Sequence, residues 1–388
     1  MKKLLALFLS VIFILSFAAC ASPSTSDTDT TEATQAATTQ APDTTEAPTT
    51  ESSEIKVDIF WYTFADTYLT SVRNSMEDQL TSMPGIKAQM IDCENDQAKQ
   101  TERVQTSLTS GVNVLVVNIV NTDSQEAAQN IVDLAKDADV PIIFFNREVK
   151  DEVINSYDKA CFVGTDADEA GYLEGEAIAN FLLDGDNLEK YDLNGDGEIS
   201  YIMLRGEEGN PEAFGRTKYS VTKANELLEG KAKLVPSSAN ATSTLYDDDG
   251  ISNFYLYGNW SAETAAALMR TALSTFKLDN GDIELIIANN DDQAIGAIEA
   301  MNELGYNTGS DPDKYIPVFG VDATDVAQQA IKDGKMTGTV LQDGPAMGAC
   351  ILALANNVAN GEDVFANTSG YNVDSSCNKI RIAYQIVK

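Results

Sequence analysis

The chain has 388 residues and a formal net charge of −34, from 60 acidic and 26 basic side chains. A charge of this sign disfavours nucleic acids and anionic membrane surfaces as partners. The sequence contains no histidine, which excludes Ser-His-Asp and Cys-His catalytic systems and histidine-bound metals. An enzyme would therefore have to work with carboxylates alone. The length favours two domains.

The first twenty residues are typical of a secretory signal sequence. Lys2 and Lys3 precede an apolar stretch, residues 4–17, that is shorter than a membrane-spanning helix requires. Small residues then lead directly into Cys20, an arrangement that resembles the lipobox of bacterial lipoproteins, whose cysteine is lipidated. We therefore expect residues 1–20 to be a lipoprotein signal peptide and Cys20 to carry the lipid. Ordinary cleavage with release is the alternative, and both place the protein outside the cytoplasm.

Residues 21–54 consist largely of Thr, Ser, Pro, Ala and acidic residues, and contain no aromatic residue, Leu or Val. Such a segment cannot bury enough apolar surface to fold. We predict a disordered tether between a lipid anchor and the folded part of the chain.

From residue 55 onward, apolar runs alternate with amphipathic segments in two successive sets. The first set predicts strands at 55–61, 86–91, 112–119 and 140–145 and helices at 66–80, 96–109 and 124–136. The second set predicts strands at 199–204, 283–288, 316–321 and 337–341 and helices at 169–183, 211–228, 262–276, 292–304, 326–333 and 345–359. Near-continuous apolar strands separated by helices indicate parallel sheets covered on both faces. The predicted fold class is α/β, with two doubly wound domains.

A short acidic segment in the second set, residues 192–200 (DLNGDGEIS), matches the front half of an EF-hand calcium loop. Oxygen-bearing side chains stand at Asp192, Asn194 and Asp196, and Gly197 takes the position of the sharp turn. The twelfth position, where an EF-hand has glutamate, is Met203, and the residues before it read as a strand. A calcium ion would need a further ligand from elsewhere in the chain. The alternative is an acidic surface turn.

Polar residues follow the predicted strands in both sets. They are Asp66, Asn118 and Asn146 in the first set and Asn290, Asp322 and Gln342 in the second. Ligands of such sheets bind beyond the carboxyl ends of the strands, so the two domains would present these side chains to one cleft. No Walker loop or GxGxxG motif follows a strand, which argues against a nucleotide site.

This combination of residue types suits a sugar. Asp and Asn accept hydrogen bonds from hydroxyl groups, Asn and Arg donate to them, and aromatic rings stack on the C–H faces of a pyranose. Tyr68, Trp260 and Arg216 are the candidate rings and cation. Taken singly, each Asp or Asn is more simply read as a helix N-cap or turn residue, whereas the set as a whole favours a sugar cleft.

The chain resembles the galactose/glucose-binding proteins, the sugar receptors of methyl-galactoside ABC transporters, within the type I periplasmic-binding-protein family. The similarity extends from about Lys56 to the last predicted strand. It rests on residues 94–97 (ENDQ), 140–146 (VPIIFFN), 156–160 (SYDKA), 163–166 (VGTD), the loop at 192–200, 286–291 (IIANND), 318–322 (VFGVD) and 338–341 (GTVL).

The resemblance implies a set of sugar-binding residues and a set of calcium ligands. The sugar site comprises Asp66, Tyr68, Asn146, Asn210, Glu212, Arg216, Trp260, Asn290, Asp322 and Gln342. Four of these depart from the family pattern, because Tyr68 stands for phenylalanine, Asn210 for histidine, Glu212 for aspartate and Gln342 for asparagine. The calcium ligands comprise Asp192, Asn194, Asp196, the carbonyl of Glu198, Ser200 with a water in place of the family's glutamine, and Glu284. The longer Glu212 and Gln342 leave the choice between galactose and glucose open.

Members of the family cross between their two lobes three times, here expected near Thr165, Leu341 and Tyr371. This predicts an N-terminal sugar-binding lobe of residues 55–165 and 342–371, and a C-terminal calcium-containing lobe of residues 166–341 and 372–388. Residues 237–258 are longer than the family's connection and include three consecutive aspartates before Trp260. This segment either covers the mouth of the cleft or is a surface insertion.

The function implied by the resemblance is that of a monomeric, lipid-anchored, extracytoplasmic protein. It would close around one galactose or glucose and deliver it to a membrane ABC permease, with calcium as cofactor. A sugar sensor that presents its closed form to a receptor kinase or chemoreceptor is the alternative, and the sequence does not separate the two. An enzyme is not expected. A carboxylate glycosidase would turn over an aryl glycoside, whereas a binding protein would bind its sugar stoichiometrically and release no product.

Overall fold

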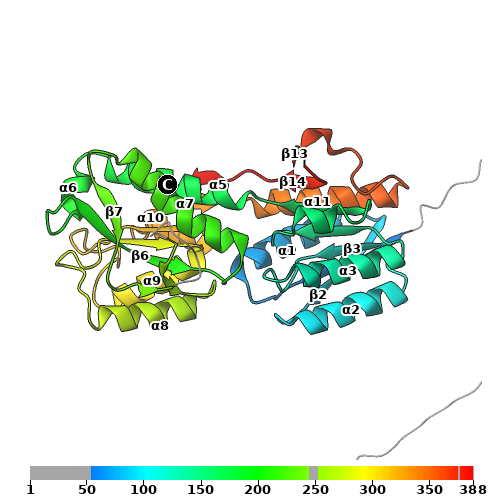
Figure 1. Ribbon diagram of the computed structural model, residues 1–388, viewed down its shortest axis with the longest axis horizontal. Helices are drawn as coiled ribbons and strands as arrows, with labels where there is room; N and C mark the ends of the chain where they lie inside the picture. The colour runs from blue at the N-terminus through cyan, green and yellow to red at the C-terminus, as the bar shows by residue number, and fades with distance from the viewer. Residues whose placement is uncertain (1–53, 244–251, 375, 388) are drawn as a thin grey trace, which may run out of the picture. The chain divides into compact units, whose positions relative to one another are not determined.

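The computed structural model describes residues 54–243, 252–374 and 376–387, which belong to one compact unit of the chain (Figure 1). The expected signal peptide, the lipidation site Cys20 and the tether up to residue 53 lie outside the described residues. So do the three aspartates at 247–249.

The first of two sheets has the strand order β13-β14-β5-β4-β3-β1-β2. Its strands are β1 (Ile55–Trp61), β2 (Ile86–Asp92), β3 (Val114–Val117), β4 (Ile142–Phe145), β5 (Ala160–Gly164), β13 (Asn372–Asp374) and β14 (Lys379–Arg381). Neighbouring strands are parallel except β13 and β14, which are antiparallel.

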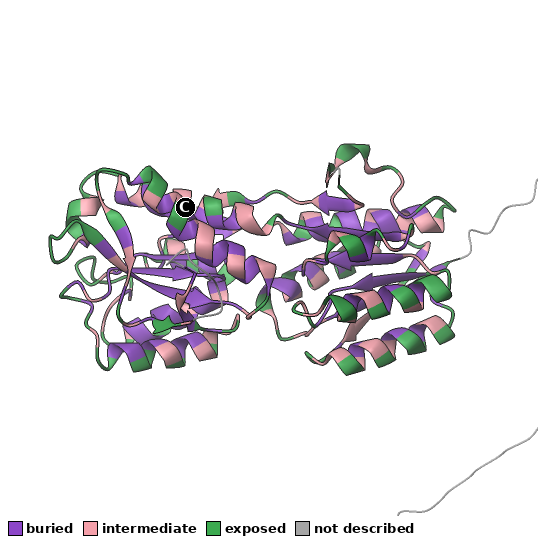
Figure 2. Ribbon diagram, viewed as in Figure 1, coloured by how far each residue is buried: buried purple, intermediate pink, exposed green. Residues whose placement is uncertain are grey.

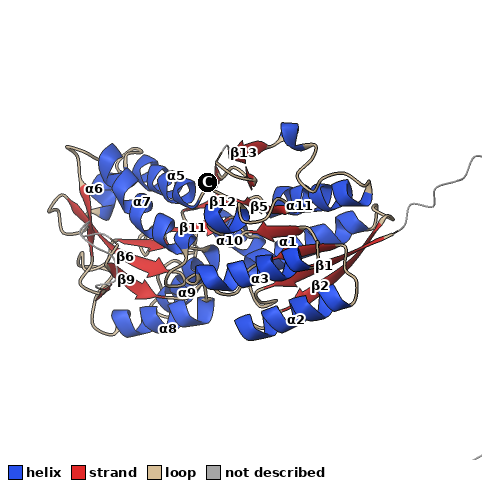
Figure 3. Ribbon diagram, turned by 45° about the vertical axis from the view of Figure 1, so that its right-hand side comes forward, coloured by secondary structure: helices blue, strands red, loops and turns tan. Residues whose placement is uncertain are grey.

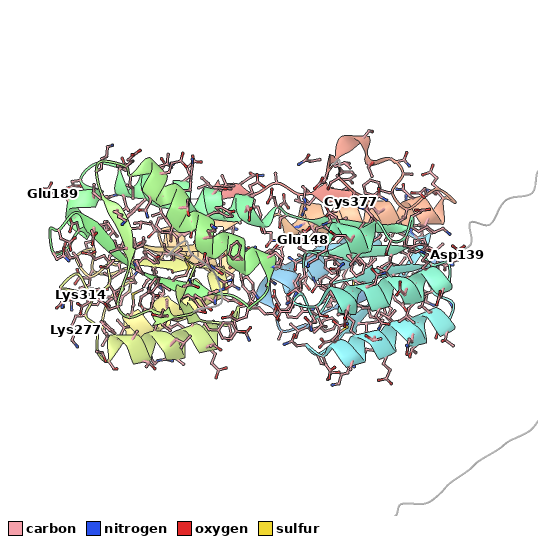
Figure 4. All side chains as sticks on the ribbon, viewed as in Figure 1. Asp139, Glu148, Glu189, Lys277, Lys314 and Cys377 are labelled. Atoms are coloured by element: carbon pink, nitrogen blue, oxygen red, sulfur yellow. The ribbon has the colours of Figure 1, made fainter. Side chains whose placement is uncertain are left out.

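Helices cover both faces of this sheet, so its inner strands β3, β4 and β5 are buried on two sides (Figures 2 and 3). They are α1 (Thr67–Leu80), α2 (Gln97–Thr109), α3 (Gln125–Asp137), α4 (Asp151–Ile154) and α11 (Gly344–Ala359). In β1, Ile59 packs in a cluster with α1 and α11, whereas Phe60 packs in a second cluster with α2, α3 and α4. This two-sided burial accounts for the near-continuous apolar runs in the sequence.

The second sheet has the strand order β15-β12-β11-β10-β6-β9-β8, with β7 also paired to β6. Its strands are β6 (Glu198–Arg205), β7 (Lys233–Pro236), β8 (Ala241–Thr242), β9 (Phe254–Tyr257), β10 (Leu285–Ala288), β11 (Val318–Asp322), β12 (Gly338–Leu341) and β15 (Gln385–Val387). Its helices are α5 (Ala167–Leu182), α6 (Asn187–Tyr191), α7 (Pro211–Leu227), α8 (Ala262–Leu273), α9 (Asp291–Asn302) and α10 (Asp325–Lys332). The 3-10 turn η1 (Thr368–Gly370) precedes β13.

Helices α5 and α7 pack closely on one face of the second sheet because glycines line their contact. A Cβ atom on Gly171 would lie 2.4 Å from the carbonyl oxygen of Gly215, and one on Gly175 would lie 2.4 Å from that of Ser220. The opposite face packs against α8, α9 and α10. The sheets and their helices form two lobes, which we name the first and second lobe after their sheets.

The chain passes between the lobes three times. It leaves the first sheet after β5, returns after β12 and leaves again after β14, because β14 pairs with β5 and β15 pairs with β12. The expected third crossing near Tyr371 is therefore wrong. Residues 372–381 belong to the first lobe, and residues 382–384 form the crossing. Strands of three residues are too short to show a periodic pattern in the sequence.

The described parts of the segment 237–258 extend the second sheet. Strand β8 pairs with β9, and β9 pairs with β6 next to the cavity described below. The side chain of Asn240 accepts a hydrogen bond from the Met203 amide and donates one to the Tyr201 carbonyl. The segment is thus anchored to the sheet at both of its described ends.

Candidate functional site

A polar cavity lies where loops of the two lobes meet. It is lined by Tyr62, Asp66, Tyr68, Asn146, Arg147, Asn210, Glu212, Arg216, Trp260, Asn290, Asp322 and Gln342. The structure therefore brings all ten sugar-site residues expected from the sequence to one cavity, and adds Tyr62 and Arg147. The space around these side chains, including the part open to solvent, amounts to about 380 Å³, but the centre of a water molecule can reach only about 30 Å³ of it. The walls from the two lobes are therefore close together.

The first lobe contributes the residues that follow β1 and β4. Asp66 accepts a hydrogen bond from the Tyr62 hydroxyl at 2.8 Å and caps α1 by accepting another from the Leu69 amide. Asn146 has a left-handed φ of 59° and is held by Asn118, whose amide group donates to its side-chain oxygen at 3.2 Å. Asn118 thus positions Asn146 and is absent from the cavity lining.

Arg216, on α7, is the centre of the hydrogen-bond network. It is 2% exposed and donates to the Asn289 carbonyl, to Glu212 and to Gln342 at 2.8–3.1 Å. It also lies 3.5 Å from Asp322. A buried guanidinium with acceptors on several sides is fixed in orientation, which suits a group that must donate to a ligand from one direction.

Two further residues of this network come from the crossings between the lobes. The hydroxyl of Tyr384 accepts from Arg216 at 3.0 Å and lies 2.9 Å from the hydroxyl of Thr165. The same Thr165 hydroxyl donates to Glu212 and accepts from Gln342. Because Arg216 also donates to Gln342, which directly follows β12, the arginine at the cavity is tied to all three chain crossings.

The second lobe places Trp260 and Asp322 in unusual backbone conformations. Trp260 has a φ of 63° and Asp322 a φ of 119°. The Trp260 ring lies against Gly206, where a Cβ atom would come within 2.3 Å of it. The side chain of Asn290 donates to the Trp260 carbonyl at 3.2 Å, which ties the two cavity residues together. Non-glycine residues with positive φ cluster at functional sites, where surrounding contacts hold them.

Three of the predicted residues also cap helices, as the simpler interpretation of each suggested. Asp66, Asn210 and Asn290 accept hydrogen bonds from the first turns of α1, α7 and α9. The cap fixes each side chain at the carboxyl end of a strand, facing the cavity. The same three residues therefore both cap a helix and line the cavity.

Burial and charge set the ionisation of the two carboxyl groups next to Arg216. Burial raises the pKa of Asp322 and of Glu212, and the nearby Arg216 guanidinium opposes both shifts. The cavity thus combines carboxyl, amide and guanidinium groups with the rings of Tyr68 and Trp260. It can accept and donate hydrogen bonds on several sides of a small polyhydroxylated molecule and stack on its apolar faces.

The interpretation of the sequence missed Tyr62, Arg147, Thr165 and Tyr384. Tyr62 directly follows β1 and Arg147 directly follows Asn146, so their position after a strand was the available signal. Tyr384 had no such signal, because it lies in a crossing that the sequence placed elsewhere.

In the acidic loop at 192–200, carboxylate oxygens accept hydrogen bonds from backbone amides. Asp192 accepts from the amides of Asp196 and Gly197, and Glu284, which is 1% exposed, accepts from those of Leu193 and Ser200 at 2.7 Å each. Within the described parts of the chain, no group of three or more His, Cys, Asp or Glu is arranged to hold a metal ion. The expected calcium ligands also include the side-chain oxygen of Asn194 and the backbone carbonyl of Glu198. All of the expected ligands are oxygen atoms, the type that calcium binds.

The cysteines in the described residues are free. Cys93, Cys161 and Cys350 are buried, and Cys377 is partly buried. Among the described helices, none is both long and apolar enough to cross a membrane.

Comparison with known proteins gives the family. Residues 57–363 match a periplasmic binding protein domain. The chain is 33% identical over 333 residues to the D-galactose/methyl-galactoside binding periplasmic protein MglB of Haemophilus influenzae, covering 86% of this chain and 89% of that protein. It is 25% identical over 282 residues to the ribose import binding protein RbsB of the same species, covering 73% and 78%.

A solved structure agrees in fold. The solute-binding protein of an ABC transporter from Bacillus halodurans, with bound myo-inositol, matches with a TM-score of 0.64 at 25% identity, covering 88% of this chain and 96% of that one. These similar proteins bind solutes and are not enzymes. The chain belongs to the family of periplasmic binding proteins, a family of extracytoplasmic binding components.

Proposed function

We propose that this protein is the sugar-binding component of an ABC transporter and that it binds one galactose or glucose molecule in the cavity between its lobes. The observation that carries this proposal is the convergence of Asp66 and Asn146 from the first lobe with Arg216, Asn290 and Asp322 from the second on one cavity. The similarity to a protein named for binding galactose and methyl-galactoside supports a hexose.

The mechanism follows from where these groups are attached. With the two lobes moving apart, the residues of each lobe would be exposed to water, and a sugar would bind first to one side. Closure would then bring the second set of donors and acceptors to the remaining hydroxyl groups. The closed form would be recognised by the membrane permease.

Glu212 and Gln342 bear on which sugar is preferred. The extra methylene of each does not simply extend it into the cavity, because Glu212 bonds to Thr165 and Arg216, and Gln342 bonds to the same two residues. Their polar atoms are thus largely satisfied within the protein. We propose that Asp66, Asn146, Asn290 and Asp322 make most of the discriminating contacts with hydroxyl groups.

Isothermal titration with galactose, glucose, xylose and methyl-galactoside tests the proposal. We expect binding of one hexose per chain, and a loss of about 1.5–3 kcal/mol on Asp322→Asn, as for a hydrogen bond to a charged group. Asp325→Asn is the matched control, because Asp325 lies in the first turn of α10, outside the cavity lining. Absence of binding by all four sugars at millimolar concentration would contradict the proposal.

We further propose that the loop at 192–200 binds calcium, with Asp192, Asn194, Asp196, Glu284, the Glu198 carbonyl and a water at Ser200 as ligands. The supporting observation is that the Glu284 carboxylate enters this loop from a distant part of the chain. Bound calcium would stabilise the second lobe by favouring its folded state.

We also propose that the mature protein is a monomer anchored to the membrane by a lipid on Cys20. Mass spectrometry of the protein from its native membrane would test this, since lipidation predicts an acylated N-terminal cysteine. A protein released into the medium without a lipid would contradict it.

A further inference from the structure

A loop of the second lobe, residues 206–210, reaches the first lobe beside the cavity. The carboxylate of Glu207 in this loop forms an ion pair with Arg147, which follows β4 in the first lobe. Arg147 is 5% exposed and its guanidinium lies 4.2 Å from the centre of the Tyr62 ring. The cation is therefore held between a ring of its own lobe and an anion of the other lobe.

Gly209 in the same loop makes a second contact with the first lobe. It has a φ of 73°, and a Cβ atom at this position would lie 1.0 Å from a carboxylate oxygen of Asp123. The positive φ favours glycine there, and a side chain would also require Asp123 to move. The loop and the first lobe are thus in direct contact at two points.

Strand β9, in the described part of the segment 237–258, packs next to this loop. The hydroxyl of Tyr255 donates to Glu208 at 2.5 Å, and the Arg205 guanidinium lies 5.0 Å from the centre of the Tyr255 ring. Strand β9, which carries Tyr255, pairs with the end of β6 immediately before the loop. Tyr255 and β9 therefore hold the loop whose residues touch the first lobe.

We propose that Glu207 is a latch that favours the closed arrangement of the lobes in the absence of ligand, and that Tyr255 positions it through Glu208. The inference rests on the proposed closure of the lobes around a sugar and adds that an ion pair within the protein contributes to that closure. The apparent dissociation constant falls as the fraction of the binding-competent form rises. The latch would therefore tighten binding without touching the sugar.

Glu207→Gln tests the latch, because it keeps the side-chain size and removes the charge. We expect the dissociation constant for galactose to rise roughly tenfold, a middle value for the coupling of contacting charged residues. We also expect the ligand-free protein to have a larger radius of gyration in small-angle X-ray scattering than the wild type. The matched control is Glu226→Gln, since Glu226 pairs with Lys223 on the same helix and is 65% exposed. It should change neither quantity.

Tyr255→Phe is the second variant and tests the positioning role separately. We expect it to weaken binding in the same direction as Glu207→Gln but by less, and to add no further loss in the double variant. Full additivity of the two losses would overturn the role of Tyr255.

The latch is overturned if Glu207→Gln retains both the wild-type affinity and the wild-type scattering without ligand. Failure of the sugar proposal gives a different result, since no variant and no wild-type protein would then bind galactose. The scattering of the ligand-free proteins would still report on the latch.

Discussion

Replacing Gly206 by alanine should displace Trp260 and weaken sugar binding while the fold is retained. The added Cβ would lie 2.3 Å from the Trp260 ring, about 1.1 Å closer than the 3.4 Å at which ordinary van der Waals contact begins. The Trp260 backbone cannot easily shift to relieve this contact, because it has a φ of 63° and its carbonyl accepts a hydrogen bond from Asn290, so the side chain has to rotate. The ring would move toward the cavity and lose its stacking position.

The expected loss is about 0.5–1.5 kcal/mol, the range for aromatic contacts in proteins, or roughly two- to twelvefold in the dissociation constant. Isothermal titration with galactose measures it, and thermal unfolding checks the fold. Gly85→Ala is the matched control, since no atom lies within 4 Å of a Cβ at that position. Wild-type affinity in Gly206→Ala would refute the role of Trp260 as a stacking ring held against Gly206.

Three further predictions concern stability. Burial raises the pKa of Asp291 to about 7, so the folded protein binds this proton more tightly than the unfolded chain does. The free energy of unfolding therefore falls as the pH rises from about 4 to 7, by up to about 1.4 kcal/mol per pH unit. Asp291→Asn should flatten this dependence in denaturant unfolding, and an unchanged slope would contradict the assignment. Removing calcium with a chelator should cost about 2.7 kcal/mol relative to a free concentration of 100 times the dissociation constant, and Glu284→Gln should abolish that difference while Glu226→Gln keeps it. Gly175→Ala should destabilise the protein by about 1–3 kcal/mol, because its Cβ would lie 2.4 Å from the Ser220 carbonyl. Thermal unfolding equal to that of Gly85→Ala would contradict this.

The sequence was informative about strands and cavity residues that a local sequence pattern is sufficient to identify. The apolar runs of β1 and β6 predicted buried strands because both of their faces are covered in the fold. Asn290 could be placed at the cavity because a strand end, a helix cap and a family motif coincide at this residue, and Asp66 because it caps the helix that follows a predicted strand.

The sequence was less informative where distant segments meet. Tyr384 belongs to the cavity network only because β14 joins the first sheet and β15 the second, and strands of three residues give no periodic signal. The pairing of Glu207 with Arg147 likewise depends on how loops of the two lobes approach each other. Neither Tyr384 nor Glu207 belongs to a sequence motif that would have indicated its contact.

The most direct test of the proposed function is a crystal structure of the protein grown with galactose. We predict one pyranose in the cavity, in contact with Asp66 of the first lobe and Asp322 of the second, with one face against the Trp260 ring. A sugar bound to one lobe only, or at any other place in the molecule, would contradict the account.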